Sequence, residues 1–185
     1  MINETINNPF PRRILFSTIC LLGCLLTGCG YSTRSLLPSS IKTIHIAPFK
    51  NKISYTTDNT RNLYLPLLEI KVRNAVVDRF LFDGHMKVKD SETADVVLKG
   101  NLLGYEREVL RYTDNNDVQE YRIRITVSIE LWDSRTEKTL WSEPSFAGET
   151  TYFITGAQAK SEDTALQDAL TDLARRIVER TIEDW

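Results

Sequence analysis

The sequence predicts an α+β domain in which two helices pack on one face of a mostly antiparallel, four-stranded sheet. Three observations lead to this fold class. Apolar and polar residues alternate strictly over residues 119–132, as in a half-buried strand. Apolar residues recur at helical spacing over 65–82 and again over 161–183, which predicts two amphipathic helices. The predicted order is β-α-β-β-β-α, with an additional short strand at 86–89.

The first predicted strand spans residues 41–49 and has apolar character on both faces. A polar loop over 51–62 separates it from the first helix, for which Gly84 provides a C-terminal stop. The core-facing residues of this helix recur at every fourth position: Leu68, Val72, Val76 and Phe80. Further apolar residues lie outside that stripe: Leu67, Ile70, Val77 and Leu81. We therefore expect the helix to be well buried, or to be covered partly by a partner.

A hairpin is predicted between a long strand that begins at Ala94 and the strand at 119–132. The apolar parity of the first strand changes after Gly104, which indicates a bulge or bend there. The turn-rich segment 113–117 joins the two strands. Centring the hairpin on Asn115 places acidic residues opposite basic ones. Each such cross-strand pair stabilises the folded state by about 0.2–1 kcal/mol. The two pairs are Glu106 with Arg124 and Glu108 with Arg122.

The last predicted strand covers residues 139–153, after a turn at 133–138. Pro144 and Gly148 interrupt it, which favours an edge strand with a break. The final helix has its apolar side at Leu166, Leu170, Leu173, Ile177 and Val178. Alanines beside these residues would permit close packing against the sheet.

The N-terminal segment is predicted to be an export signal. Arg12 and Arg13 precede an apolar run over residues 14–26. A run of this length is too short for a membrane span, which needs about 20 residues, but it suits the apolar region of a signal peptide. The run ends in Leu26-Thr27-Gly28-Cys29, which is typical of the cleavage site of a bacterial lipoprotein.

The lipoprotein interpretation divides the chain into three parts. Residues 1–28 are expected to be removed, and Cys29 is expected to carry diacylglycerol and palmitate. Residues 29–40 would then form a lipidated tether, and 41–185 a single domain. More than one acyl chain is needed for a stable membrane anchor. The cysteines that precede Cys29 leave with the signal, so the mature chain is expected to have no free thiol and no disulfide.

Composition excludes several functional classes. The chain has 185 residues, with 23 Lys and Arg against 25 Asp and Glu, so it lacks the basic excess of a nucleic-acid-binding protein. His45 lies within a predicted strand and is interpreted as structural, because no further ligands stand at metal-binding spacing. Neither His45 nor His85 belongs to a recognisable catalytic motif. We expect no enzyme activity, no cofactor and no metal, with an envelope hydrolase as a weak alternative.

Several segments resemble the LptE family, the lipopolysaccharide-assembly lipoproteins of the Gram-negative outer membrane. The mature start, Cys29-Gly30-Tyr31, has the family's form. Residues 108–111 lead through a polar turn into 120–127, which resembles the family's central hairpin, and 157–160 also correspond. The resemblance implies a sandwich of two helices and four strands that plugs the β-barrel protein LptD. It also implies that the domain helps that barrel to assemble and binds lipopolysaccharide on its way to the outer leaflet.

The resemblance also implies a location and a ligand site. Gly30, rather than Asp, follows Cys29, as in lipoproteins sorted to the outer membrane, so we expect a lipid-anchored domain on its periplasmic face. Arg111 and Lys160 match the family's lipopolysaccharide-contacting residues. In the predicted register Arg111 faces Gln119 and has no carboxylate partner, whereas Glu162 and Asp163 lie close to Lys160 in sequence.

Two points stay open at this stage. An alternative function is an envelope lipoprotein that docks on a periplasmic enzyme, such as a cell-wall synthase, and regulates it. That function needs the same anchor and a similar domain, but no affinity for lipopolysaccharide. Arg107 falls on the apolar parity of its strand, and the sequence gives no account of it.

Overall fold

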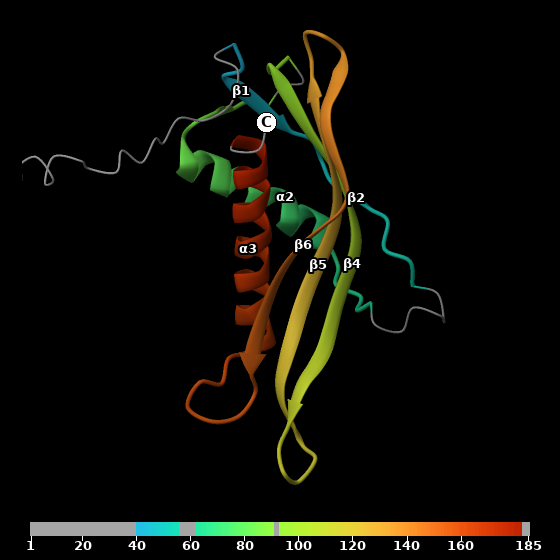
Figure 1. The fold of residues 1–185 in the computed structure, drawn as a ribbon, viewed down its shortest axis with the longest axis vertical. Coiled ribbons are helices and arrows are strands. Elements are labelled where there is room, and N and C mark those ends of the chain that lie inside the picture. The colour runs from blue at the N-terminus through green and yellow to red at the C-terminus, as the bar shows by residue number, and fades with distance from the viewer. Residues whose placement is uncertain (1–39, 56–61, 91–92, 183–185) are drawn as a thin grey trace, which may run out of the picture. The chain divides into compact units, whose positions relative to one another are not determined.

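The computed structural model describes residues 40–55, 62–90 and 93–182, which form one sheet with two helices packed against it (Figure 1). The predicted signal peptide, Cys29 and the tether up to residue 39 lie outside the described residues. Neither helix within these ranges has the length and apolarity that a bilayer span requires. The elements in chain order are β1 (Thr43–Ile46), β2 (Lys50–Asn51), α2 (Leu68–Asp83), β3 (Lys87–Val88), β4 (Val96–Tyr112), β5 (Val118–Asp133), β6 (Lys138–Phe153) and α3 (Glu162–Ile182).

The sheet is mixed, and this corrects the prediction of four mostly antiparallel strands. Its six strands run in the order β3-β1-β4-β5-β6, with β2 paired to β4 beside this path. β4, β5 and β6 are antiparallel, but β1 runs parallel to both β3 and β4, and β2 runs parallel to β4. The α+β class was right, whereas the strand number and part of the strand direction were wrong.

The parallel strands follow from the position of α2 in the chain. A strand, a helix and a second strand in one sheet form a parallel crossover, because the helix carries the chain back to the end at which the first strand began. Pro48 lacks a backbone N–H for a strand ladder. Of the predicted strand at 41–49, β1 covers only residues 43–46, and β2 lies beyond it at 50–51. The consecutive buried residues 96–98 in β4 are also typical of a strand beside parallel neighbours.

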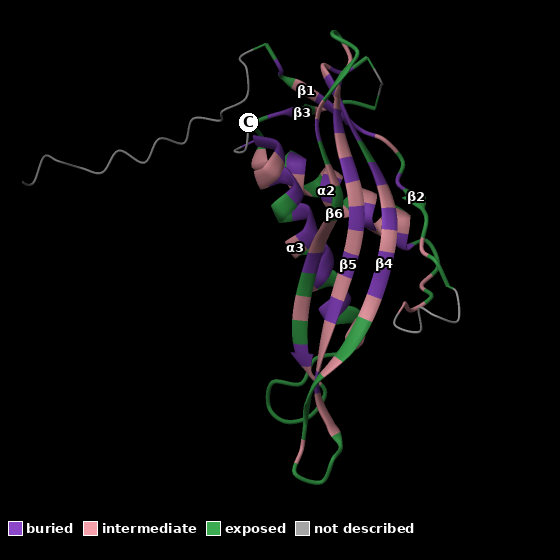
Figure 2. Ribbon diagram, turned by 45° about the vertical axis from the view of Figure 1, so that its right-hand side comes forward, coloured by how far each residue is buried: buried purple, intermediate pink, exposed green. Residues whose placement is uncertain are grey.

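The predicted hairpin is confirmed. Glu106 pairs with Arg124 and Glu108 with Arg122, and the register shifts between Leu102 and Gly104, next to the predicted position. The favourable ion pair lies elsewhere, however, because Arg124 Nη2 contacts Glu149 on β6, at 2.9 Å. Buried and partly buried residues alternate along β5 (Figure 2), so its apolar side chains face the helices and its polar ones face away.

β6 is an edge strand with a break, as predicted. It ends the strand order, and its pairing with β5 shifts between Glu143 and Phe146, on either side of Pro144. Both helices lie on one side of the sheet, with α3 crossing in front of α2 (Figure 1). The C-terminal stop of α2 is also as predicted, since Gly84 has a φ of 76° and donates its N–H to the carbonyl of Phe80 at 3.1 Å.

Gly148 sets how closely α3 approaches the sheet. A Cβ added at this position would lie 2.4 Å from the backbone nitrogen of Leu173, closer than any real contact. Leu173 is itself 1% exposed, so the helix has no free space into which it could move. The pairing of β6 with β5 is regular through Gly148, so this glycine serves packing, and the interruption predicted there lies at Pro144 instead.

We expect Gly148→Ala to lower the free energy of unfolding by about 1–3 kcal/mol, because overpacking a close-packed core forces the backbone to shift. Thermal or urea unfolding measures the change. Ser145→Ala, on the exposed part of the same strand, is the control and should unfold with the unchanged chain. Equal stability of the two variants would show that α3 does not pack on Gly148.

Candidate functional site

Arg111 lies near the end of β4, where the hairpin approaches its turn. The β4–β5 register shifts between Val109 and Arg111, so that Arg111 pairs with Glu120 rather than Gln119. Arg111 Nε then lies 3.5 Å from Glu120 Oε2. The expectation that Arg111 has no carboxylate partner was therefore wrong, because a bulge at Leu110 moves the pairing of Arg111 by one residue, before a second shift returns Tyr112 to Val118.

Phe153 lies beside Arg111 at the end of β6. It pairs with Glu120 in the β5–β6 register, so the three residues form a row across three strands. Arg111 Cζ is 5.7 Å from the centroid of the Phe153 ring, within the range of a cation–π contact. The Arg111 side chain is still 59% exposed, so its guanidinium remains accessible from solvent.

The loop over residues 154–160 brings Lys160 back to the same phenylalanine. Within this loop, Gly156 adopts the left-handed backbone conformation, with a φ of 86°. Ile154 donates its N–H to the carbonyl of Gln119 at 3.1 Å, and Lys160 donates its N–H to the carbonyl of Phe153 at 2.9 Å. Arg111 and Lys160, which are 49 positions apart in the sequence, therefore both contact Phe153.

Lys160 pairs with a carboxylate, but not with one of the two suggested by the sequence. Its Nζ lies 2.8 Å from Asp168 Oδ2, and both side chains are about half exposed. Asp168 lies on the face of α3 that is turned toward the loop, whereas Glu162 bonds elsewhere. Ion pairs this exposed contribute about 0–1 kcal/mol to the free energy of unfolding. An anion that carries more charge can therefore replace the carboxylate.

Apolar side chains border the two cations. Leu110, Tyr112 and Ile154 are exposed, and a hollow of about 490 Å³ is lined by residues 151–153 and 157–160. Figure 2 shows that the end of the hairpin and the neighbouring loop are largely exposed. We call this combined surface the tip surface, defined by Leu110, Arg111, Tyr112, Phe153, Ile154 and Lys160. It presents positive charge beside exposed apolar area, as an amphiphilic anion requires.

The structure explains Arg107, which the sequence did not. Its guanidinium forms an ion pair with Glu162 at the start of α3 and lies 4.8 Å from the centroid of the Tyr121 ring. The Tyr121 ring stacks in turn on Tyr152, with centroids 5.8 Å apart. The signal was present in the sequence, because an arginine on the apolar parity of a strand must find a partner on the helix side.

A buried tyrosine strengthens the same connection. The Tyr105 hydroxyl donates a hydrogen bond to Glu162 Oε1 at 3.3 Å. Burial, together with the neighbouring carboxylate of Glu162, raises the pKa of Tyr105 above its ordinary value, so the hydroxyl stays protonated and keeps donating. Glu162 thus ties β4 to the first turn of α3 and fixes the loop that carries Lys160.

Each of the two histidines has a hydrogen-bond partner within the domain. His45 Nδ1 is 2.9 Å from the carbonyl of Lys89, which fits the structural role expected for it. His85 Nδ1 lies 2.8 Å from Asp83 Oδ2, close to its own backbone. Within residues 40–55, 62–90 and 93–182, no group of three or more His, Cys, Asp or Glu side chains could hold a metal ion.

Solved structures similar to this chain include bacterial proteins of low sequence identity. Protein XCC0632 from Xanthomonas campestris has a TM-score of 0.56 at 14% identity, over 80% of this chain and 87% of that chain. Protein CT253 from Chlamydia trachomatis has a TM-score of 0.50 at 13% identity, over 76% of this chain and 95% of that chain. Lipoprotein B from Nitrosomonas europaea has a TM-score of 0.49 at 16% identity, over 79% of this chain and 84% of that chain. The first two support the fold alone, since identities this low say nothing of function.

Sequence comparison gives the more specific result. No curated protein sequence matches the chain. A family model described as "LptE: Lipopolysaccharide-assembly", however, matches residues 41–181. The match spans both helices, the central hairpin and the loop that carries Lys160, and so confirms the resemblance found in the sequence. The chain therefore belongs to the LptE family of lipopolysaccharide-assembly proteins.

Proposed function

We propose that this chain is a non-enzymatic, outer-membrane lipoprotein that binds lipopolysaccharide at the tip surface and partners an LptD-like β-barrel. One observation carries the ligand part of the proposal: Arg111 and Lys160 both contact Phe153, beside exposed apolar side chains. Lipopolysaccharide combines phosphate groups with acyl chains. A guanidinium donates two parallel hydrogen bonds to a phosphate, and an ammonium adds a point charge.

The existing ion pairs are compatible with such a ligand. Glu120 holds Arg111 only at 3.5 Å, which is longer than a strong charge-assisted hydrogen bond. Asp168 holds Lys160 on an exposed surface, where solvent screens the attraction. A phosphate carries more charge and more acceptor oxygens than either carboxylate. It therefore competes well for both cations without any movement of the strands.

We expect Arg111→Gln and Lys160→Gln each to weaken lipopolysaccharide binding about tenfold, because a lost hydrogen bond to a charged group costs about 1.5–3 kcal/mol. The measurement is capture of lipopolysaccharide by the purified full-length protein in a neutral detergent. Arg124→Gln is the matched control, since it removes an exposed arginine that is also paired with a carboxylate, Glu149. If all three variants bound equally well, the tip surface would not be the ligand site.

The partner part of the proposal rests on α2. Its core-facing residues are buried, as expected, but the opposite side of the helix is not. Ile70 is 48% exposed and Leu81 63%, and at 100° per residue both lie opposite the buried stripe. The sequence left burial or a partner as the two explanations for this apolar side. Because the sheet and α3 leave it uncovered, we assign it to the barrel, since a clustered apolar patch marks an interaction site.

We expect Ile70→Ser combined with Leu81→Ser to reduce co-purification with the barrel about tenfold or more, because each fully buried side chain contributes about 1.5–3 kcal/mol. Quantitative pull-down from detergent-solubilised envelopes provides the readout. Tyr55→Ser, which changes an exposed residue outside both α2 and the tip surface, serves as control and should retain the barrel. Capture of a periplasmic enzyme in place of a barrel would instead favour the regulatory alternative.

The lipid anchor is a separate prediction. Mass spectrometry of the mature protein should find Cys29 as the first residue, carrying fatty acyl groups, because the preceding tetrapeptide fits lipoprotein processing. Cys29→Ala should abolish acylation, whereas Cys24→Ala, which changes a cysteine inside the expected signal, should leave it intact. A mature chain that retains Met1 and lacks acyl groups would contradict the anchor and the proposed location.

A further inference from the structure

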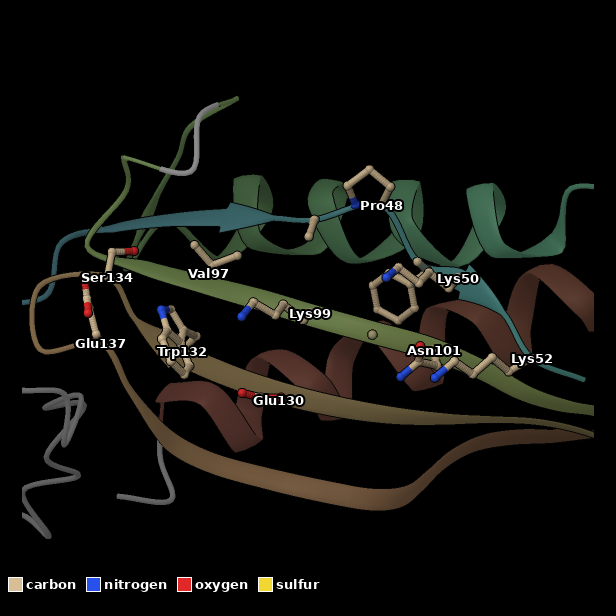
Figure 3. Close-up of a pocket in the computed structure, with 13 residues that line it drawn as sticks. Pro48, Lys50, Lys52, Val97, Lys99, Asn101, Glu130, Trp132, Ser134 and Glu137 are labelled. Carbon is tan, nitrogen blue, oxygen red and sulfur yellow. The ribbon is translucent and has the colours of Figure 1, made fainter.

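A second hollow lies on the face of the sheet that the helices leave uncovered (Figure 3). It has a volume of about 880 Å³ and is far from the tip surface. Asn101, which lines it, is ten residues before Arg111 on β4, or about 33 Å along an extended strand. Its polar and aromatic lining includes Lys50, Lys52, Lys99, Asn101, Glu130 and Trp132. We call this hollow the lysine groove.

Backbone contacts fix the shape of the lysine groove. The segment at 47–52 forms one wall and is held to β4 at both ends. Ala47 donates its N–H to Leu98 at 3.0 Å, and Lys52 donates its N–H to Leu102 at 2.8 Å. The Phe49 ring packs directly over Gly100, where an added Cβ would lie 2.2 Å from the ring. The wall is therefore part of the folded core and not a movable loop.

Three lysine side chains, Lys50, Lys52 and Lys99, line this groove. In Figure 3 the Lys52 side chain extends toward Asn101, and that of Lys99 extends toward Trp132. Lys99 Nζ lies 4.3 Å from the centroid of the Trp132 ring. Within the described part of the chain, no ion pair shorter than 4.0 Å involves Lys50, Lys52 or Lys99.

Neither carboxylate of the groove, Glu130 or Glu137, forms an ion pair with these lysines within the described residues. Glu130 lies across the strand from Lys99, but its Oε1 accepts a hydrogen bond from the Thr139 hydroxyl at 2.7 Å. Glu137 lies with Ser134 at the other end of the groove (Figure 3). Three like charges around one hollow repel one another. An anion between them would turn that repulsion into attraction.

We infer that the lysine groove binds the phosphate group of a phosphate ester. Lysine binds phosphate as a point charge, and several lysines can share one tetrahedral anion better than one planar carboxylate. The groove is larger than a phosphate alone. Its remaining length, with Trp132, Ser134 and Glu137, would accommodate a polar group attached to that phosphate.

Two sources of phosphate fit this chemistry, a lipid headgroup and a free phosphate ester. The lipid source gains support from the path of the chain. Arg135, between the groove residues Ser134 and Glu137, donates a hydrogen bond to the carbonyl of Ser40 at 3.3 Å. Ser40 lies only 11 positions after Cys29, a reach of at most about 39 Å. This argument alone rests on the proposed lipidation of Cys29; the phosphate site itself does not.

Lysine footprinting on the full-length protein tests the inference. An amine-reactive reagent is applied in neutral detergent with inorganic phosphate, with monomeric dihexanoyl phosphatidylglycerol, or with chloride at equal ionic strength. We expect modification of Lys50, Lys52 and Lys99 to slow about threefold when a probe is at twice its Kd. Lys89 and Lys138, which are exposed outside the groove, should react at an unchanged rate.

Each result has a defined meaning. Protection by both probes identifies the phosphate group as the ligand, and protection by the lipid alone identifies a lipid headgroup. Equal reactivity in phosphate, lipid and chloride would overturn the inference. So would a uniform slowing at every lysine, because that would be general screening of charge and not occupation of a site.

A variant comparison gives an independent check. Combining Lys50→Gln, Lys52→Gln and Lys99→Gln should weaken binding of the protecting probe at least about tenfold. Combining Lys42→Gln, Lys87→Gln and Lys89→Gln removes the same charge from outside the groove and should leave binding unchanged. Circular dichroism confirms that both proteins are folded. Arg111→Gln should also retain groove binding, so failure at the tip surface and failure at the groove are distinguishable.

Discussion

The pairing of β4 with β5 is the constraint on which the rest of this structure depends. The two long antiparallel strands extend the sheet well beyond its parallel part, and they connect the other elements to one another. β1 and β2 pair with one side of β4, and β6 pairs with the far side of β5. The tip surface and the lysine groove lie on different parts of the same hairpin. A change in its register would therefore alter both.

A single extra residue in β4 determines which side chains meet at the tip surface. The bulge at Leu110 places Arg111 opposite Glu120, and Glu120 pairs in turn with Phe153. Without the bulge, Arg111 would face Gln119, and its guanidinium would lie one position farther from the aromatic ring. The ion pair that results joins the exposed Arg111 to the largely buried Glu120, with 3.5 Å between Nε and Oε2.

The domain uses its two outer surfaces differently. The helices cover one face of the sheet, and α3 is held close to it by Gly148. α2 is apolar on both sides, so burying its core stripe leaves Ile70 and Leu81 exposed. The opposite face of the sheet carries polar alternation along β5 and the three lysines of the groove. The apolar patch and the lysine groove therefore lie on separate faces of the domain.

The sequence by itself determined the elements that depend on local pattern. Strict alternation over 119–132, the periodicity of both helices, Gly84 and the Gly104 bulge all predicted the observed structure, because burial of one face imposes a regular spacing along the chain. The family resemblance, carried by short matching segments, was confirmed by the family comparison. Arg111 and Lys160 came from that resemblance, and the structure places both of them against Phe153.

Only the tertiary structure decided what depends on contacts between distant segments. The direction of β1, β2 and β3 follows from the crossover through α2, which apolar parity does not report. The Leu110 bulge does not disturb the alternation of apolar and polar residues, since the residues around it are polar or exposed. The predicted partner of Arg111 was therefore wrong. Glu162 pairs with Arg107, and Asp168 pairs with Lys160, because α3 runs back along the sheet. Pattern fixes which face of an element is buried, but the pairing of charges depends on which elements the fold brings side by side.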